Sequence, residues 1–345
     1  MKTKHNILVT SAGRRGYIID YFKEVLNGNG KVHVGNSNIF SAAMSHGDRS
    51  VITPNIYDQN YVEFLLDYCM KEEIDIIVPL FDIDLPILAK NEAVFKENGV
   101  RVIVSDYDVV SVCNDKWETY QFCKNNGIFC PISFIDTDDL FVSIDKGIVS
   151  YPIIVKPRRG MGSLSVYMAN NEDELRVLSR KCNEGIQNTY LKYEASDIIE
   201  KAVIYQEYIK GQEYAVDVIN DLDGNYITCS VKKKIAMRAG ETDCAMMVKE
   251  EMLERLSRRI SLSLRHIANL DVDIMMKEDG HPFLIEMNAR LGGGYPFSHL
   301  AGINLPKAIV KWIDNEEITE ELSIMKYGEI YQKDISFVSI SQNVR

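Results

Sequence analysis

The first hundred residues alternate short apolar stretches with amphipathic segments, and this order restricts the possible fold more than any other feature of the chain. The stretches at 7–9, 32–34, 74–78 and 100–104 predict strands, and the segments at 18–26, 61–71 and 85–97 place their apolar residues on one helical face. Strands separated by helices form parallel sheets that are covered on both faces. We therefore expect an α/β domain with an open parallel sheet at residues 1–113.

Beyond residue 128 the pattern changes to strand pairs with intervening helices, which predicts an α+β fold. The predicted strands lie at 153–156, 165–168, 203–208, 213–220, 226–232, 272–277 and 283–288, and Asp223-Gly224 favours a tight turn. We expect helices at 115–125, capped by Asn114, at 249–269, and from Asn171, where Glu174 completes a capping box. The expected divisions are two subdomains at 114–205 and 206–310, and a segment at 311–345, with a helix at 316–322 and an edge strand at 335–340, for packing or homodimer formation.

Composition excludes several classes of protein. The chain has 345 residues and a formal net charge of 39 − 50 = −11, whereas a non-specific nucleic-acid binder is normally basic. Its apolar runs fall short of the roughly 20 residues that span a bilayer, and its N-terminal residues do not resemble a signal peptide. The count of seven cysteines is odd and contains no C-x-x-C pair, which is typical of reduced cytoplasmic thiols. We expect a cytoplasmic protein without nucleic-acid or membrane partners.

The strongest chemical signal is a polar row on a late pair of apolar strands. Glu286 and Asn288 are two residues apart on one strand and therefore face the same way, and Asp273 on the paired strand can join them. Two carboxylates on an otherwise apolar hairpin are costly unless a cation compensates them, and Mg²⁺ prefers oxygen ligands. Arg290 extends the row, and three glycines follow. The alternative is a strand pair with one polar, solvated face.

Two further segments predict contacts to a nucleotide. Lys156 ends a strand and precedes a glycine-containing loop, so its ammonium group and the loop amides can contact phosphates. The alternative is a hairpin with a solvated lysine, and the spacing excludes a P-loop. The extended segment at 204–209 can pair with an adenine edge, and Glu213 can bind ribose hydroxyls, although surface strands often carry glutamate.

The turn after the first strand, Ser11-Ala-Gly-Arg14-Arg15-Gly16, approximates a dinucleotide fingerprint. No acidic residue follows the second strand, so NAD binding is disfavoured. A sharp packed turn and an anion site using Arg14 and Arg15 both stay open. Asp82, after the third strand, is either a ligand contact or a helix cap.

Together these motifs resemble the ATP-grasp superfamily, and in particular a single synthetase unit of the carbamoyl-phosphate synthetase large chain, over residues 116–304. The resemblance implies a pre-ATP-grasp domain followed by an ATP-grasp fold of two subdomains, with ATP and Mg²⁺ or Mn²⁺ as cofactors. It implies ATP contacts from Lys116, Lys156, Arg159, Gly160, Gly162, Ser163, Gln206, Glu207, Tyr208, Ile209 and Glu213, metal ligands Asp273, Glu286 and Asn288, and catalytic roles for Arg290 and Lys156. The loop is poorer in glycine than in many members, and only one unit is present.

The resemblance implies an ATP-dependent ligase that activates a small carboxylic acid as an acyl phosphate and joins it to an amine. The alternatives are an enzyme that phosphorylates a carboxylate or carbamate without ligation, a non-catalytic ATP-binding regulator and a nicotinamide-dependent oxidoreductase. For substrate recognition we expect Lys234 and Arg238 to hold one carboxylate, although a mobile basic loop is equally compatible with the sequence. Backbone amides at Gly292 and Gly293, together with Arg14, Arg15 and Asp82, are the other substrate candidates.

Overall fold

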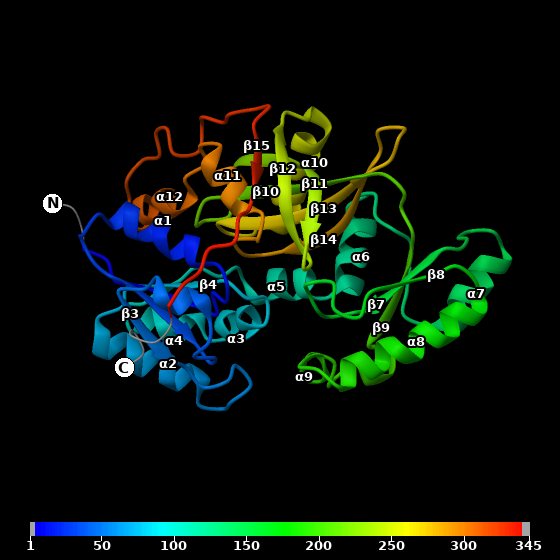
Figure 1. Ribbon diagram of the computed structural model, residues 1–345, viewed down its shortest axis with the longest axis horizontal. Helices are drawn as coiled ribbons and strands as arrows, with labels where there is room; N and C mark the ends of the chain where they lie inside the picture. The colour runs from blue at the N-terminus through cyan, green and yellow to red at the C-terminus, as the bar shows by residue number, and fades with distance from the viewer. Residues whose placement is uncertain (1–3, 340–345) are drawn as a thin grey trace.

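The computed structural model describes residues 4–339 and contains three β-sheets arranged side by side along the longest axis of the molecule (Figure 1). The N-terminal sheet lies at one end, a six-stranded sheet lies in the middle and a four-stranded sheet lies at the other end. Among the helices of residues 4–339, none combines the length and apolar character needed to cross a bilayer.

The N-terminal sheet is parallel throughout, as its sequence pattern predicts. Its strand order is β3-β2-β1-β4-β5, with β1 at Ile7–Thr10, β2 at Val32–Asn36, β3 at Arg49–Ile52, β4 at Ile76–Pro79 and β5 at Arg101–Val102. The helices are α1 (Gly16–Leu26), α2 (Tyr61–Glu72), α3 (Asp84–Lys90) and α4 (Glu92–Glu97). The helix expected at 85–97 is therefore two helices that meet at Asn91. Strand β3 is missing from the prediction because only two of its residues are apolar.

Two helices join the N-terminal sheet to the rest of the chain, α5 (Tyr107–Asn114) and α6 (Lys116–Asn125). The prediction that Asn114 caps the second helix is wrong. Asp115 is the cap, because its side chain accepts hydrogen bonds from the backbone N–H groups of Trp117 and Glu118. Asn114 instead ends α5, and its side-chain amide donates to the backbone oxygen of Asp82 over 2.6 Å.

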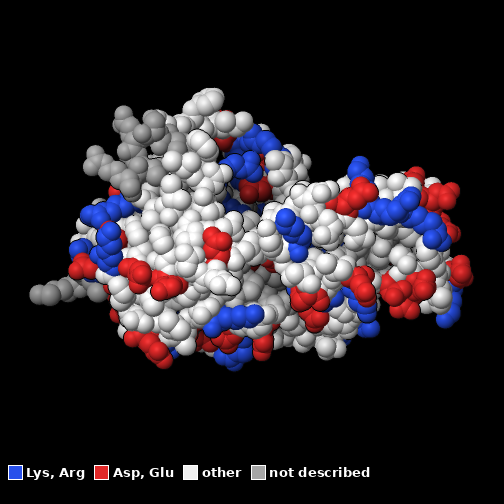
Figure 2. Space-filling view, turned by 90° about the horizontal axis from the view of Figure 1, so that it is seen from below, with Lys and Arg blue, Asp and Glu red and all other residues white. Residues whose placement is uncertain are grey.

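The four-stranded sheet has the order β6-β9-β7-β8, with β6 at Ser133–Phe134, β7 at Ile153–Pro157, β8 at Tyr167–Ala169 and β9 at Val203–Glu207. Helices α7 (Thr137–Asp145), α8 (Glu172–Gln187) and α9 (Leu191–Glu194) accompany it. Asn171 caps α8 as predicted, since it accepts a hydrogen bond from the N–H of Glu174, but the Glu174 carboxylate accepts from the backbone N–H of Asn170 and so does not complete the capping box. Figure 2 shows positive and negative side chains intermixed over this lobe, so the face in view offers no continuous positive surface to a polyanion.

The six-stranded sheet is antiparallel, in the order β14-β13-β10-β11-β12-β15. Its strands are β10 (Gln212–Asn220), β11 (Tyr226–Arg238), β12 (Glu241–Val248), β13 (Asn269–Met276), β14 (Pro282–Asn288) and β15 (Ile330–Gln332). One face packs its apolar residues, among them Val216, Val272 and Met287, against Leu253 and Ile260 of α10 (Glu251–Leu264). The other face carries the polar residues described below, so strand alternation separates the core from the candidate site.

The C-terminal segment returns to the N-terminal domain. It contains α11 (Tyr295–Leu300) and α12 (Leu305–Ile313), and Leu305 and Ile309 share a buried core with Ile18 and Phe22 of α1. The helix predicted at 316–322 is absent, and the edge strand lies at β15 instead of 335–339; residue 340 lies outside the described residues. The helix expected to reach residue 269 ends at Leu264, because β13 begins at Asn269.

Candidate active site

A cleft of about 260 Å³ separates the four-stranded sheet from the six-stranded sheet. Its walls come from β7 and β9 on one side and from β10, β13 and β14 on the other. It contains most of the residues that the sequence assigns to ATP and two of the three assigned to the metal, namely Lys116, Lys156, Gly160, Ser163, Gln206, Glu207, Tyr208, Ile209, Glu213, Asp273 and Glu286. Segments far apart in the sequence thus converge on one cleft.

Two lysines supply positive charge to this cleft. Burial and the nearby Lys116 lower the pKa of Lys156 to about 8, although Glu286 and Asp273 oppose the shift. The ammonium group of Lys116 donates a hydrogen bond of 2.6 Å to the backbone oxygen of Gly160 and lies 3.6 Å from Glu286. A buried lysine with a lowered pKa gains from an anionic ligand, so Lys156 is suited to contact phosphate.

The loop after β7 is anchored at its base. The Asp115 carboxylate accepts hydrogen bonds from Nε of Arg158 at 2.7 Å and from Nε of Arg159 at 3.0 Å. Arg159 also donates to Asp197 over 2.7 Å, so its side chain fixes the loop and does not line the cleft. Gly162 does not line the cleft either, and its φ of +65° is a conformation that favours glycine. The ATP contacts expected from Arg159 and Gly162 stay predictions, and neither residue is part of the cleft wall in this structure.

The expected metal ligands lie on adjacent strands, where Asp273 is directly opposite Glu286 and Asp271 is opposite Asn288. Among residues 4–339 no group of three or more His, Cys, Asp or Glu side chains is arranged as a metal site. Two carboxylates and one amide nevertheless supply only oxygen ligands, which suits a Mg²⁺ ion that completes its shell with phosphate and water. The donor set therefore fits the ion.

A lysine of this chain already contacts two of the acids. The ammonium group of Lys234 lies 2.7 Å from Asp273 and 2.6 Å from Glu213. Burial acts to lower the pKa of Lys234, but the two carboxylates outweigh burial and raise it. Burial also raises the pKa of Asp273 to about 6, although Lys234 opposes this shift. A cation is thus favourable at this point of the cleft.

Lys234 and Arg238, which are expected to hold one substrate carboxylate together, form ion pairs with different acids in this structure. Both lie on β11, but register shifts interrupt its pairing with β12 between them. Nε of Arg238 donates to Asp243 over 2.7 Å at the exposed end of the hairpin, whereas Lys234 faces the cleft. The two positive charges therefore serve different acids.

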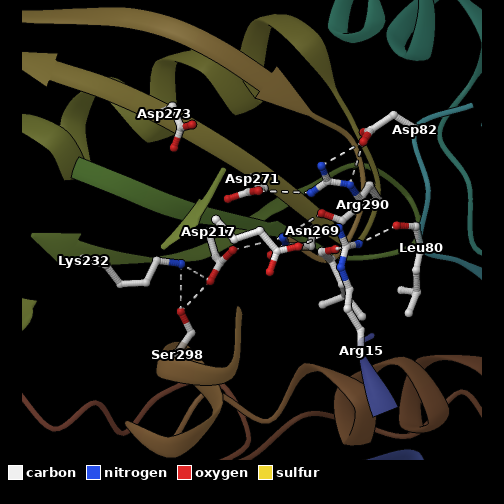
Figure 3. Close-up of polar contacts among 12 residues, drawn as sticks. Arg15, Leu80, Asp82, Asp217, Lys232, Asn269, Asp271, Asp273, Arg290 and Ser298 are labelled. Atoms are coloured by element: carbon white, nitrogen blue, oxygen red, sulfur yellow. Dashed lines mark hydrogen bonds and ion pairs between the residues drawn. The ribbon is translucent and has the colours of Figure 1, made fainter. Parts of the chain in front are cut away.

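Arg290 does not line the cleft but joins the N-terminal domain to the six-stranded sheet (Figure 3). Its Nε and Nη2 donate to Oδ2 of Asp82 at 3.1 and 2.8 Å, and its Nη1 donates to Asp271 at 3.1 Å. Burial acts to lower the pKa of Arg290, but Asp82 and Asp271 outweigh burial and raise it. Asn288, the third expected metal ligand, does not line the large cleft. It lines a smaller cavity together with Asp82.

Arg15 also reaches the sheet boundary, as Figure 3 shows. Its Nη1 donates a hydrogen bond of 2.5 Å to the backbone oxygen of Leu80, and its Nη2 lies 3.7 Å from Glu241. Burial and the nearby Arg290 lower the pKa of Arg15, whereas Arg14 is exposed. Since Arg15 is half-buried at this junction and Arg14 is exposed, the structure separates the two arginines that the sequence groups together.

The glycines after β14 allow two acids to approach the backbone. A Cβ atom on Gly292 would lie 2.1 Å from the Asp271 carboxylate, and one on Gly293 would lie 2.9 Å from Glu241. A larger residue at 292 would displace the Asp271 carboxylate from Arg290, whereas at 293 only the flexible end of Glu241 would have to shift.

Sequence reasoning missed a buried ion pair behind the site. Lys232 and Asp217, both fully buried, form an ion pair, and Ser298 and Asn269 donate hydrogen bonds to Asp217 (Figure 3). Asp217 lies opposite Asp271 across β10 and β13. The alternation of Asn269, Asp271 and Asp273 is the sequence signal that could have extended the polar face to these residues.

Comparison with known families agrees with this geometry. Residues 149–298 match the ATP-grasp domain, and residues 7–103 match the PylC-like, N-terminal domain. The first match contains the loop after β7, the segment 204–209 that is expected to pair with adenine, and the Asp273 and Glu286 pair. The second match corresponds to the parallel sheet.

Individual proteins agree as well. The chain is 24% identical to D-alanine--D-alanine ligase of Bacillus anthracis over 256 residues, which cover 68% of this chain and 78% of that protein. It is 24% identical to the carbamoyl phosphate synthase large chain of Campylobacter jejuni over 230 residues, 63% of this chain but 20% of that protein. The biotin carboxylase structure from Campylobacter jejuni, at 16% identity, shares the fold with a TM-score of 0.72 over 93% of this chain and 73% of that one.

Proposed function

The chain belongs to the ATP-grasp superfamily, and on this premise we propose that it is an ADP-forming ligase that activates a small carboxylic acid with ATP and joins it to an amine. The observation that carries the proposal is the single cleft in which Lys156, Glu213, Asp273 and Glu286 meet the extended segment 206–209. This cleft combines positive charge for phosphates, the end of β9 and the residues after it for a purine, and oxygen ligands for a cation.

Different residues of the cleft contact different parts of ATP. Backbone groups of residues 206–209 hold the adenine, Glu213 binds the ribose, and Lys116 and Lys156 neutralise the phosphates. Asp273, Glu286 and Asn288 would hold Mg²⁺, which when bound stabilises the charge that develops on the transferred phosphoryl group. Arg290 keeps the N-terminal domain against the sheet through Asp82, so we assign it a positioning role beside the expected catalytic one.

The ligation step is supported by the likeness to a D-alanine--D-alanine ligase along 78% of that protein. An acid attacks the terminal phosphate of ATP, ADP leaves, and the amine then displaces phosphate from the acyl phosphate. Each step brings anions together, so positioned cations supply most of the acceleration. The seven free cysteines suit the reducing cytoplasm in which we place the protein.

ADP release by the purified protein tests this function. A panel of carboxylic acids is supplied with MgATP, each with and without a panel of primary amines. We expect release that requires both an acid and an amine, and its loss in Glu286→Gln. Glu278→Gln, which alters an exposed residue on the turn of the same hairpin, is the matched control and keeps full activity.

Two results would contradict the proposal. Release with an acid that carries no amino group, in the absence of an added amine, identifies phosphorylation without ligation. Unchanged release in Glu286→Gln shows that the metal assignment is wrong.

A further inference from the structure

A second, much smaller cavity of about 10 Å³ lies between the N-terminal domain and the ATP-grasp sheets. Asp82, Asn114, Glu194, Glu286 and Asn288 contribute to its wall. A volume of this size holds one water-sized group. Because Glu286 and Asn288 belong to both this wall and the expected metal site, the cavity adjoins the place where the phosphoryl group is transferred.

Two residues of this wall each carry a side-chain acceptor that lacks a partner. Within residues 4–339, Oδ1 of Asp82 and Oδ1 of Asn114 are buried and have no hydrogen-bond partner. Asp82 is 4% exposed, and its other oxygen, Oδ2, already accepts both hydrogen bonds from Arg290. The amide of Asn114 cannot be turned around, because its nitrogen donates to the backbone oxygen of Asp82. Buried acceptors without donors are costly, so both atoms favour a ligand that donates hydrogen bonds.

The charges around the cavity favour a cation. The charged side chains of its wall, Asp82, Glu194 and Glu286, are all acidic. Each acid has one partner outside the wall. Arg290 pairs with Asp82, Lys116 lies 3.6 Å from Glu286, and the hydroxyl of Tyr57 donates to Glu194 over 2.7 Å. A carboxylate or phosphate in this position would meet three acids, whereas an ammonium group would meet acceptors on several sides.

We propose that this cavity binds the primary ammonium group of a substrate, with Asp82 and Asn114 as its hydrogen-bond acceptors. The inference rests on the proposed function and adds a substrate class to it. The small volume admits an ammonium head and excludes a trimethylated one. The group belongs either to the amine substrate or to an amino group carried by the acid.

Calorimetric titration with propylammonium chloride tests the site in the presence and absence of Mg²⁺ and a non-hydrolysable ATP analogue. We expect binding to the wild type, weakened by roughly tenfold or more in Asp82→Asn and in Asn114→Leu. Asp271→Asn is the matched control, since it also removes one carboxylate partner of Arg290 but leaves the cavity wall intact. Trimethylpropylammonium and propionate should not bind at this site.

The inference is overturned if propylammonium does not bind, or if both variants bind it as well as the wild type does. Equal binding of the trimethylated probe, or displacement of propylammonium by MgCl₂ alone, would also overturn it. Nucleotide binding is measured on the same samples, and its failure contradicts the proposed function independently. In the ADP-release assay, the substrate whose KM rises in Asn114→Leu identifies the source of the ammonium group. Thermal unfolding confirms that each variant is folded, and Asn114→Leu keeps the test decisive if Asp82→Asn does not fold.

Discussion

The ammonium group of Lys234, on β11, lies 2.7 Å from a carboxylate oxygen of Asp273, on β13, although β10 lies between these two strands in the sheet. The same ammonium group contacts Glu213, so one side chain links the acid expected to bind ribose with an acid expected to bind the metal. Lys234 thus supplies the positive charge that these acids need in the protein without ligands.

Lys234→Met should destabilise the ligand-free protein, because it leaves Asp273 and Glu213 without their cation. Since both acids are about one-third exposed, we expect a loss of only about 1–2 kcal/mol in the free energy of unfolding. MgADP should reduce this loss by supplying the missing charge. Urea unfolding with and without MgADP measures it, and Lys233→Met, on the opposite face of β11, is the control. Equal losses in the two variants would contradict the assignment.

Lys156→Met should weaken MgADP binding by roughly tenfold or more, because the cleft loses a buried charge expected to contact phosphate. Calorimetric titration measures the affinity. Lys146→Met removes an exposed lysine of the same lobe and should leave the affinity unchanged. Unchanged binding in Lys156→Met would place the phosphates elsewhere.

Breaking the buried pair of Lys232 and Asp217 should be among the most damaging single changes. Lys232→Met leaves a fully buried carboxylate without its cation, which costs about 3–5 kcal/mol in unfolding free energy. The double variant Lys232→Met/Asp217→Asn should recover part of this loss, because no unpaired charge is left. Chemical unfolding of both single variants and the double variant forms the test. Additive losses would show that the two residues do not act as a pair.

Asp84 should make the stability of the protein depend on pH. Burial raises its pKa from 3.8 to about 6, while a hydrogen bond from Ser11 opposes the shift. The folded state therefore holds a proton that the unfolded state releases, so stability falls as pH rises from about 4 to about 6 and stays low above. Asp84→Asn should remove this fall and stabilise the protein by up to about 3 kcal/mol at pH 7, with little effect near pH 4.

Unfolding of the wild type and Asp84→Asn over this pH range measures the difference between them. Asp108→Asn, which alters an exposed acid on α5, should give a difference that does not vary with pH. If the difference in unfolding free energy between the wild type and Asp84→Asn did not vary with pH, burial would not raise the pKa of the Asp84 carboxyl group.

The sequence is informative where a residue's direction follows from strand alternation. Asp273, Glu286 and Asn288 could be placed on one face before the structure was known, because side chains two apart on a strand point the same way. Arg290, two residues beyond the end of β14, still contacts Asp271 on this face, but the sequence does not predict that it also reaches Asp82 of the N-terminal domain. Beyond the end of a strand, tertiary contacts decide the direction of a side chain.

Other features depend on contacts that no local pattern encodes. The pairing of Lys234 with Asp273 requires the registers of three strands, including the irregular pairing of β11. The return of α12 to α1 joins residues about three hundred positions apart in a shared core. The small cavity depends on the same kind of contact, because Asn114 and Asp82 meet only when α5 lies against the N-terminal sheet.

A crystal structure with Mg²⁺ and a non-hydrolysable ATP analogue tests the central claim most directly. The account predicts the adenine against residues 206–209, the phosphates beside Lys156, and the ion bound by oxygens of Asp273, Glu286 and Asn288. An analogue bound outside the cleft, or an ion bound by none of these three side chains, would contradict it.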